Sequence, residues 1–177
     1  MQKIYLQKIR AREKERKMEK VLEKPLLHYD GSLLSVFREG DVAAKITKVK
    51  KGSLNNDNLS PPTPLLVVSP IIPGTYPVLL FFHGFVLKPS WYKSLLQHIS
   101  SHRYIVVAPQ FSPLVSQSQE VKKAAKVTEW LSNGALEYVL PEKVQPDLLK
   151  LAVSGHSRGG KTAFSLALGY GNLSNST

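Results

Sequence analysis

The chain has 177 residues, 42% of them hydrophobic, with a formal net charge of +11 and no cysteine. This length supports one hydrophobic core and therefore a single domain, and the lack of cysteine excludes disulfides and thiolate metal sites. The longest apolar run, residues 78–82, is far shorter than the roughly 18 residues of a membrane-spanning helix, so no such helix is expected.

The positive charge is concentrated near the N-terminus, where residues 1–51 hold 14 Lys and Arg against 7 Asp and Glu. Residues 1–24 are good helix formers without a sustained apolar stripe, and their four Glu and lack of Ser are unlike a transit peptide. Residues 1–34 are therefore predicted to be a basic, solvated N-terminal extension. A membrane-binding or nucleic-acid-binding arm is the rival interpretation. No nucleic-acid partner is expected, because Tyr5 is the only aromatic residue among the first 24.

A β-hairpin is predicted to follow this extension. Residues 44–49 alternate apolar and polar side chains, as a half-buried strand does. Residues 52–63 are a cluster of turn formers, and a β-type run resumes at residues 64–68. The two runs are interpreted as an antiparallel hairpin at the edge of a sheet.

The rest of the chain alternates between strand and helix patterns. Three near-continuous apolar runs are typical of strands covered on both faces of a parallel sheet, namely residues 76–82, 104–109 and 148–154. Helices are predicted between and after them, one capped by Ser90, one over residues 119–138 and one over residues 161–169. This alternation predicts an α/β fold with a mostly parallel sheet and right-handed crossovers.

Residues 155–159 (GHSRG) form a Gly-x-Ser-x-Gly motif between the last predicted strand and the last predicted helix. In this setting the sharp strand-to-helix turn holds the serine in a strained, exposed conformation that suits a nucleophile. Gly155 and Gly159 have no Cβ to collide with their neighbours, and Gly160 is expected to ease the approach of helix to strand. Ser157 is therefore the predicted catalytic nucleophile.

Hydrolysis through a serine also requires donors for the oxyanion that develops on the substrate. In enzymes with such an elbow, the donors are the backbone N–H after the nucleophile and one in the loop after an earlier strand. The predicted donors are the N–H groups of Arg158 and Phe85, and Gly84 is expected to let the loop approach the scissile carbonyl. His83 is interpreted as a structural histidine that braces this loop, and His156 as a side chain packed beside the sheet rather than a base.

Several motifs in order resemble plant chlorophyllases, the α/β-hydrolase family that cleaves the phytyl ester of chlorophyll. They are PLLVVSP, GTYPVLLFF, FFHGF, the strand ending in VAPQ and, above all, GHSRGGKTAF. The likeness runs from about residue 35 to residue 171, so residues 35–177 are interpreted as the N-terminal part of an α/β-hydrolase domain. It implies a Ser-His-Asp mechanism without metal or other cofactor, and chlorophyllide and phytol as products of chlorophyll catabolism. It also implies a chloroplast location and peripheral contact with membranes; a cytosolic location is the alternative.

The expected triad order is Ser, then Asp or Glu, then His, yet residues 158–177 contain no Asp, Glu or His. The fold is therefore expected to be truncated after the nucleophile helix, with an exposed strand edge and with the chain alone inactive. Two other functions stay open: a cutinase-like or dienelactone-type ester hydrolase, and a non-catalytic fragment that binds pigment or regulates.

Overall fold

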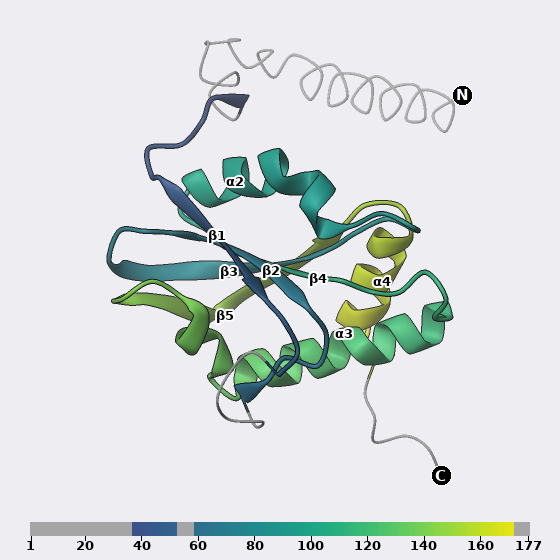
Figure 1. Ribbon diagram of the computed structural model, residues 1–177. Coiled ribbons are helices and arrows are strands. Elements are labelled where there is room, and N and C mark those ends of the chain that lie inside the picture. Colours follow the sequence, from purple (N-terminus) through teal and green to yellow (C-terminus); the bar gives the residue numbers. More distant parts are fainter. Residues whose placement is uncertain (1–36, 53–58, 172–177) are drawn as a thin grey trace, which may run out of the picture. The chain divides into compact units, whose positions relative to one another are not determined.

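The computed structural model describes residues 37–52 and 59–171 (Figure 1). The chain divides into two units, residues 1–38 and 39–177, and the fold below is that of the second. The predicted extension over residues 1–34 lies outside the described residues, so its boundary and character stay predictions.

The described part of the second unit contains a five-stranded sheet with strand order β1-β2-β4-β3-β5. Strand β1 (Ala44–Val49) pairs antiparallel with β2 (Leu65–Pro70), which confirms the predicted hairpin. Strand β2 is also antiparallel to β4 (Ile105–Pro109), whereas β3 (Gly74–Phe82) lies parallel to both β4 and β5 (Val144–Gly155). All of these strands except β2 thus run in one direction. The mixed α/β architecture with a mostly parallel sheet was predicted and is consistent with a hydrolase-like fold.

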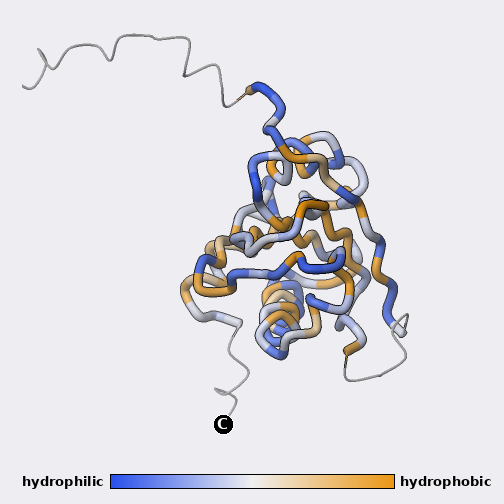
Figure 2. The backbone as a smooth tube through the Cα atoms, turned by 90° about the vertical axis from the view of Figure 1, so that its left-hand side faces the viewer, coloured by the Kyte–Doolittle hydropathy of each residue, from blue (hydrophilic) through white to orange (hydrophobic). Residues whose placement is uncertain are grey.

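Helices cover both faces of the sheet (Figure 1). Helix α2 (Lys93–Ser101) lies on one face, and α3 (Gln117–Ser132) and α4 (Arg158–Ala167) lie on the other. Figure 2 shows hydrophobic strand segments in the middle of the molecule, with helices that alternate between hydrophobic and hydrophilic residues. No helix among the described residues is both long enough and apolar enough to cross a membrane.

The apolar runs reflect burial on both faces of the central strands. In β4, Val106 belongs to the core beneath α2, and its neighbour Val107 belongs to the core beneath α3 and α4, and neither is exposed. Because successive side chains of a strand point to opposite faces, a doubly covered strand needs apolar residues at every position. Strands β3 and β4 therefore form the buried centre from which the loops of the candidate site extend.

Boundaries of all three predicted helices differ from the structure, and α4 spans Arg158–Ala167 instead of residues 161–169. Ser90 does not cap a helix, because Pro89–Tyr92 forms a 3₁₀ turn (η3) and α2 begins after Tyr92 without a side-chain cap. Helix α3 ends at Ser132 rather than residue 138, because Gly134 adopts a left-handed conformation with φ of 75°. Its start is set by a capping box in which Ser116 and Gln119 each bond the other's backbone N–H. A short 3₁₀ helix, η4 (Ala135–Val139), follows.

Strand β5 is longer and more exposed than predicted. It pairs with β3 and with no other described strand, and the Leu149 side chain is fully exposed. The expectation that residues 148–154 are buried on both faces is therefore wrong for the described structure, whereas the expected exposed strand edge is present. Leu151 and Val153 line an open groove of about 540 Å³ between β5, α3 and α4.

Candidate active site

Ser157 lies between β5 and α4 in a backbone conformation that ordinary residues avoid. Its φ is 53° and its ψ is −116°, and it is exposed at the N-cap position of α4. A positive φ in a residue with a Cβ costs of the order of 1–3 kcal/mol and persists only where the surroundings enforce it. The predicted strained turn is thus present, with the serine at its tip.

Neighbouring glycines enforce that turn by close backbone approach. A Cβ on Gly159 would lie 2.1 Å from the carbonyl oxygen of Phe82, and one on Gly155 would lie 2.5 Å from the carbonyl of Gly159. Both positions therefore require glycine, as predicted. Gly160 differs, because its Cβ would make only an ordinary contact, 3.4 Å from the Gly155 oxygen. The expected steric role of Gly160 is not supported.

His83 braces the loops that follow β3 and β4. Its ring is buried, Nδ1 lies 2.8 Å from the carbonyl oxygen of Gly84, and Nε2 accepts a hydrogen bond of 2.9 Å from the Phe111 N–H. Because a carbonyl only accepts and an amide only donates, the ring is neutral with its proton on Nδ1. This agrees with the predicted structural role and leaves neither nitrogen free for proton transfer.

Tyr92 joins the loop after β3 to the serine turn. Its hydroxyl accepts a hydrogen bond of 3.1 Å from the Gly84 N–H and lies 2.8 Å from Nδ1 of His156. A Cβ on Gly84 would lie 2.9 Å from the same nitrogen, so the loop directly abuts the turn. His156 is exposed rather than packed beside the sheet as expected, and it is held by Tyr92. Sequence reasoning missed Tyr92, since no local pattern indicates its contact with His156, 64 residues later in the chain.

Arg158, the first residue of α4, connects three segments through its side chain. Its Nε forms an ion pair of 2.7 Å with Glu120 of α3, Nη2 donates to the Val115 carbonyl at 2.5 Å, and the guanidinium lies 5.2 Å from the Phe85 ring centre. Glu120 is buried and also accepts a 2.7 Å hydrogen bond from Thr162. Glu120 was missed by sequence reasoning because nothing local distinguishes it from a solvated helix residue.

The hydroxyl of the predicted nucleophile and the two predicted oxyanion donors are not engaged in other hydrogen bonds within the described structure. Among the described residues, no acceptor is bonded to the backbone N–H of Phe85 or Arg158, and the Ser157 hydroxyl has no hydrogen-bond partner. Arg158 lies in the first turn of α4, where backbone N–H groups lack intrahelical acceptors and favour negative charge. The Ser157 hydroxyl and these two N–H groups are therefore unoccupied by partners within the described residues.

Metal-binding residues do not gather in this region. Within the described ranges, no three His, Cys, Asp or Glu side chains are placed to hold a metal ion. The expectation that the site uses no metal or other cofactor stays a prediction.

Comparison with known proteins identifies relatives of this sequence. The family model "Chlorophyllase" matches residues 32–176. Chlorophyllase-2 of Arabidopsis thaliana is 42% identical over 141 residues, which cover 78% of this chain and 43% of that protein. "Chlorophyllase-1, chloroplastic" of Citrus unshiu is 43% identical over 141 residues (78% and 42%), and "Chlorophyllase type 0" of Chenopodium album is 41% identical over 161 residues (86% and 44%).

The family-model match includes the strands, the loop after β3 and the serine turn described above. The chain spans less than half the length of the curated relatives it matches. A family model that matches most of the chain, together with identities above 40%, establishes the relationship. The chain belongs to the chlorophyllase family.

Proposed function

We propose that this chain carries the nucleophile and oxyanion donors of a serine carboxylic ester hydrolase that cleaves the phytyl ester of chlorophyll. The observation that carries the proposal is the strained, exposed conformation of Ser157 at the start of α4. Such a conformation is expected where a nucleophile must project from a strand-to-helix turn. The family relationship supports chlorophyll as the substrate, with chlorophyllide and phytol as products.

The proposed reaction proceeds through an acyl-enzyme. Oγ of Ser157 attacks the ester carbonyl while a base takes the serine proton, and the N–H groups of Phe85 and Arg158 stabilise the oxyanion. Collapse of the tetrahedral intermediate breaks the bond to phytol, which leaves with the proton. Water then hydrolyses the chlorophyllide–serine ester and regenerates the hydroxyl.

The base and its orienting carboxylate are proposed to come from polypeptide outside residues 1–177. Residues 158–177 contain no Asp, Glu or His, and the relatives are more than twice the length of the matched region. The groove beside β5 and the exposed side chains of Phe164 and Leu168 offer a surface that further polypeptide of the same fold can cover. The 177-residue chain alone is proposed to retain at most residual activity, since oxyanion donors act weakly without a base.

The proposed site of action is the chloroplast, at a membrane surface. The support is the chloroplastic designation of the Citrus relatives and the membrane-bound nature of a phytyl ester. No nucleic-acid partner is proposed.

The test is a chimera of this chain with the Chlorophyllase-2 residues that follow the counterpart of Gly171. The chimera should release chlorophyllide from chlorophyll, as measured by chromatography. The 177-residue chain should release little or none. A short acyl ester supplied side by side separates the alternatives, because a cutinase-like or dienelactone-type enzyme would prefer it. A chimera that binds chlorophyll and cleaves neither ester would favour a non-catalytic pigment-binding role.

A further inference from the structure

Large apolar side chains are exposed around the serine turn. They extend from the loop after β3, from η3 and from the loop after β4, and their exposed fractions are 52% for Phe85, 57% for Val86, 66% for Trp91 and 93% for Leu114. These loops follow the carboxyl ends of the parallel strands, and they meet at the end of the sheet where α4 begins (Figure 1). We call these four residues, together with Lys88 and Lys93, the elbow face.

Side-chain and backbone contacts place these residues close to one another. The Arg158 guanidinium lies against the Phe85 ring and donates to the carbonyl of Val115, the residue after Leu114. The hydroxyl of Tyr92, the residue after Trp91, accepts from the Gly84 N–H, the residue before Phe85. Each of these loops therefore contacts the serine turn through a residue of the elbow face or through the direct neighbour of one.

The elbow face is basic as well as apolar. Lys88 and Lys93 are exposed on either side of Trp91, and the Trp91 N–H donates to the Lys88 carbonyl at 2.9 Å. No Asp or Glu occurs between residues 58 and 119. The next acidic residue, Glu120, is buried and paired with Arg158, so it contributes no exposed negative charge.

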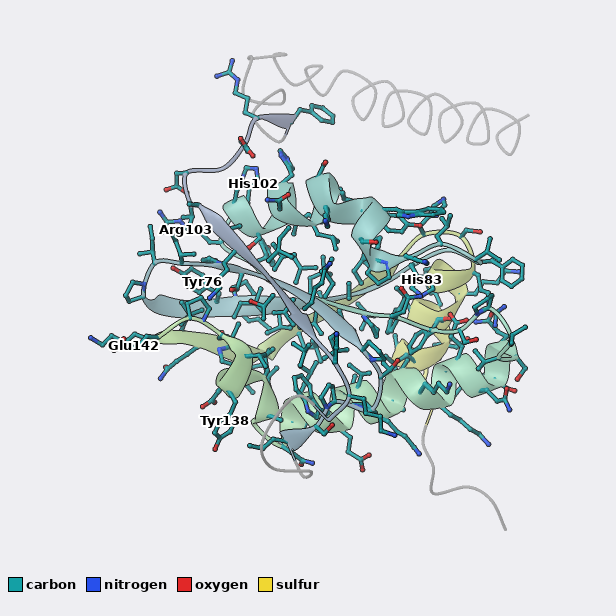
Figure 3. The ribbon with its side chains drawn as sticks, in the orientation of Figure 1. Tyr76, His83, His102, Arg103, Tyr138 and Glu142 are labelled. Atoms are coloured by element: carbon teal, nitrogen blue, oxygen red, sulfur yellow. The ribbon has the colours of Figure 1, made fainter. Side chains whose placement is uncertain are left out.

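The other end of the sheet has a different character. There the exposed charges are mixed, with Asp41 paired to Arg103 and Glu142 beside Lys143. Figure 3 shows Arg103 and Glu142 at the end of the sheet opposite His83. At the serine end, by contrast, the exposed Lys88 and Lys93 occur beside exposed apolar side chains, in a stretch of sequence without acidic residues.

We propose that the elbow face docks on an anionic lipid bilayer. Tryptophan and phenylalanine side chains favour the boundary between headgroups and acyl chains. Each lysine near an anionic surface raises the affinity roughly fivefold. Docking by this face presents Ser157 to the bilayer. The inference deepens the membrane location proposed above, on which it rests, by assigning the surface that binds and the lipid charge that it favours.

The test uses the full chain and vesicles of phosphatidylcholine with or without phosphatidylglycerol. Cosedimentation should show stronger binding to the anionic vesicles. The double variant Lys88→Gln/Lys93→Gln should lower the partition coefficient on anionic vesicles about 30-fold. Trp91→Ala should lower it about tenfold on both compositions.

Matched controls lie at the opposite end of the sheet. Ile72, 49% exposed in the connection from β2 to β3, is the apolar control as Ile72→Ala, and Lys143→Gln/Lys150→Gln is the charge control. Both should bind as the unsubstituted chain does. Equal losses of binding in the controls and in the elbow-face variants would overturn the proposal. Full binding by the elbow-face variants would also overturn it and would assign the binding to the N-terminal residues. Dependence on the lysines without dependence on Trp91 would indicate a general anion-binding surface and also overturn it.

Tryptophan fluorescence gives an independent readout. The chain has two tryptophans, and Trp130 is buried with its Nε1 donating to the Leu59 carbonyl. A blue shift on addition of anionic vesicles should therefore arise from Trp91, and Trp91→Phe should bind without the shift. A shift that persists in Trp91→Phe would place the lipid contact elsewhere. Because the vesicles hold no chlorophyll, these results do not depend on the role of Ser157.

Discussion

The guanidinium carbon of Arg158 lies 5.2 Å from the centre of the Phe85 ring, so one side chain joins the two residues whose N–H groups are proposed to stabilise the oxyanion. A cation over an aromatic ring is attracted by the ring's negative face. Glu120 and the Val115 carbonyl bind nitrogen atoms of the same guanidinium. The loop after β3 and the first turn of α4 are thereby fixed relative to each other.

Breaking the ion pair should destabilise the fold. Glu120→Gln keeps the shape of the side chain and an acceptor for Thr162 but leaves Arg158 without its counter-charge. We expect the free energy of unfolding to fall by about 2–3 kcal/mol, because the arginine is mostly but not fully buried. Urea unfolding monitored by circular dichroism measures the change. Glu129→Gln, at an exposed position of the same helix, should change it by less than about 0.5 kcal/mol, and equal losses in both variants would contradict the assigned role.

Two adjacent glycines of α4 should respond oppositely to alanine. Gly159→Ala drives a Cβ into the backbone of Phe82 and should cost roughly 3 kcal/mol. Gly160→Ala meets only an ordinary contact, so the better helix propensity of alanine should raise stability by up to about 1 kcal/mol. Thermal unfolding of the two variants provides the measurement. A destabilised Gly160→Ala would mean that helix and strand approach more closely than described.

The predictions from sequence were correct where the structural requirement itself dictates a local residue pattern. The apolar runs of β3 and β4 were identified because strands covered on both faces require such residues, and the serine turn was identified because its glycines have no substitute. The same apolar pattern gave a wrong prediction of burial for β5, because the sequence of residues 148–154 does not indicate whether other elements cover the faces of that strand. The roles of Glu120 and Tyr92 depend on contacts between segments far apart in sequence, which no local pattern encodes. The end of α3 was signalled by Asn133-Gly134 and was overlooked.

Removing one hydroxyl should loosen the loop after β3. Tyr92→Phe leaves the buried Gly84 N–H and the His156 Nδ1 without their shared partner. The expected loss of stability is about 1–2 kcal/mol, the cost of an unsatisfied buried donor. Tyr138→Phe is the control, because that side chain is exposed. If urea midpoints of the two variants coincide, the Tyr92 hydroxyl has no bracing role.

The Asp41–Arg103 pair gives a pH-dependent prediction. The hydrogen bond from Arg103 lowers the pKa of the Asp41 carboxyl below its ordinary value of 3.8. A lowered folded-state pKa stabilises the fold above the unfolded-state pKa, and this stabilisation is lost as the pH falls through the folded-state value. Asp41→Asn should therefore be slightly less stable than the unsubstituted chain at neutral pH, and the difference should shrink in acid. Because both side chains are exposed, high salt should also reduce it; a difference that grows in acid would contradict the sign.

Ser157→Ala in the chimera with the Chlorophyllase-2 segment tests the central claim most directly. The substitution removes only the hydroxyl oxygen, so circular dichroism and urea unfolding should match those of the unsubstituted chimera. Chlorophyllide release measured by chromatography should fall by roughly 10⁴-fold or more, because nucleophilic attack is lost. Chlorophyllide release at an unchanged rate would show that Ser157 is not the nucleophile.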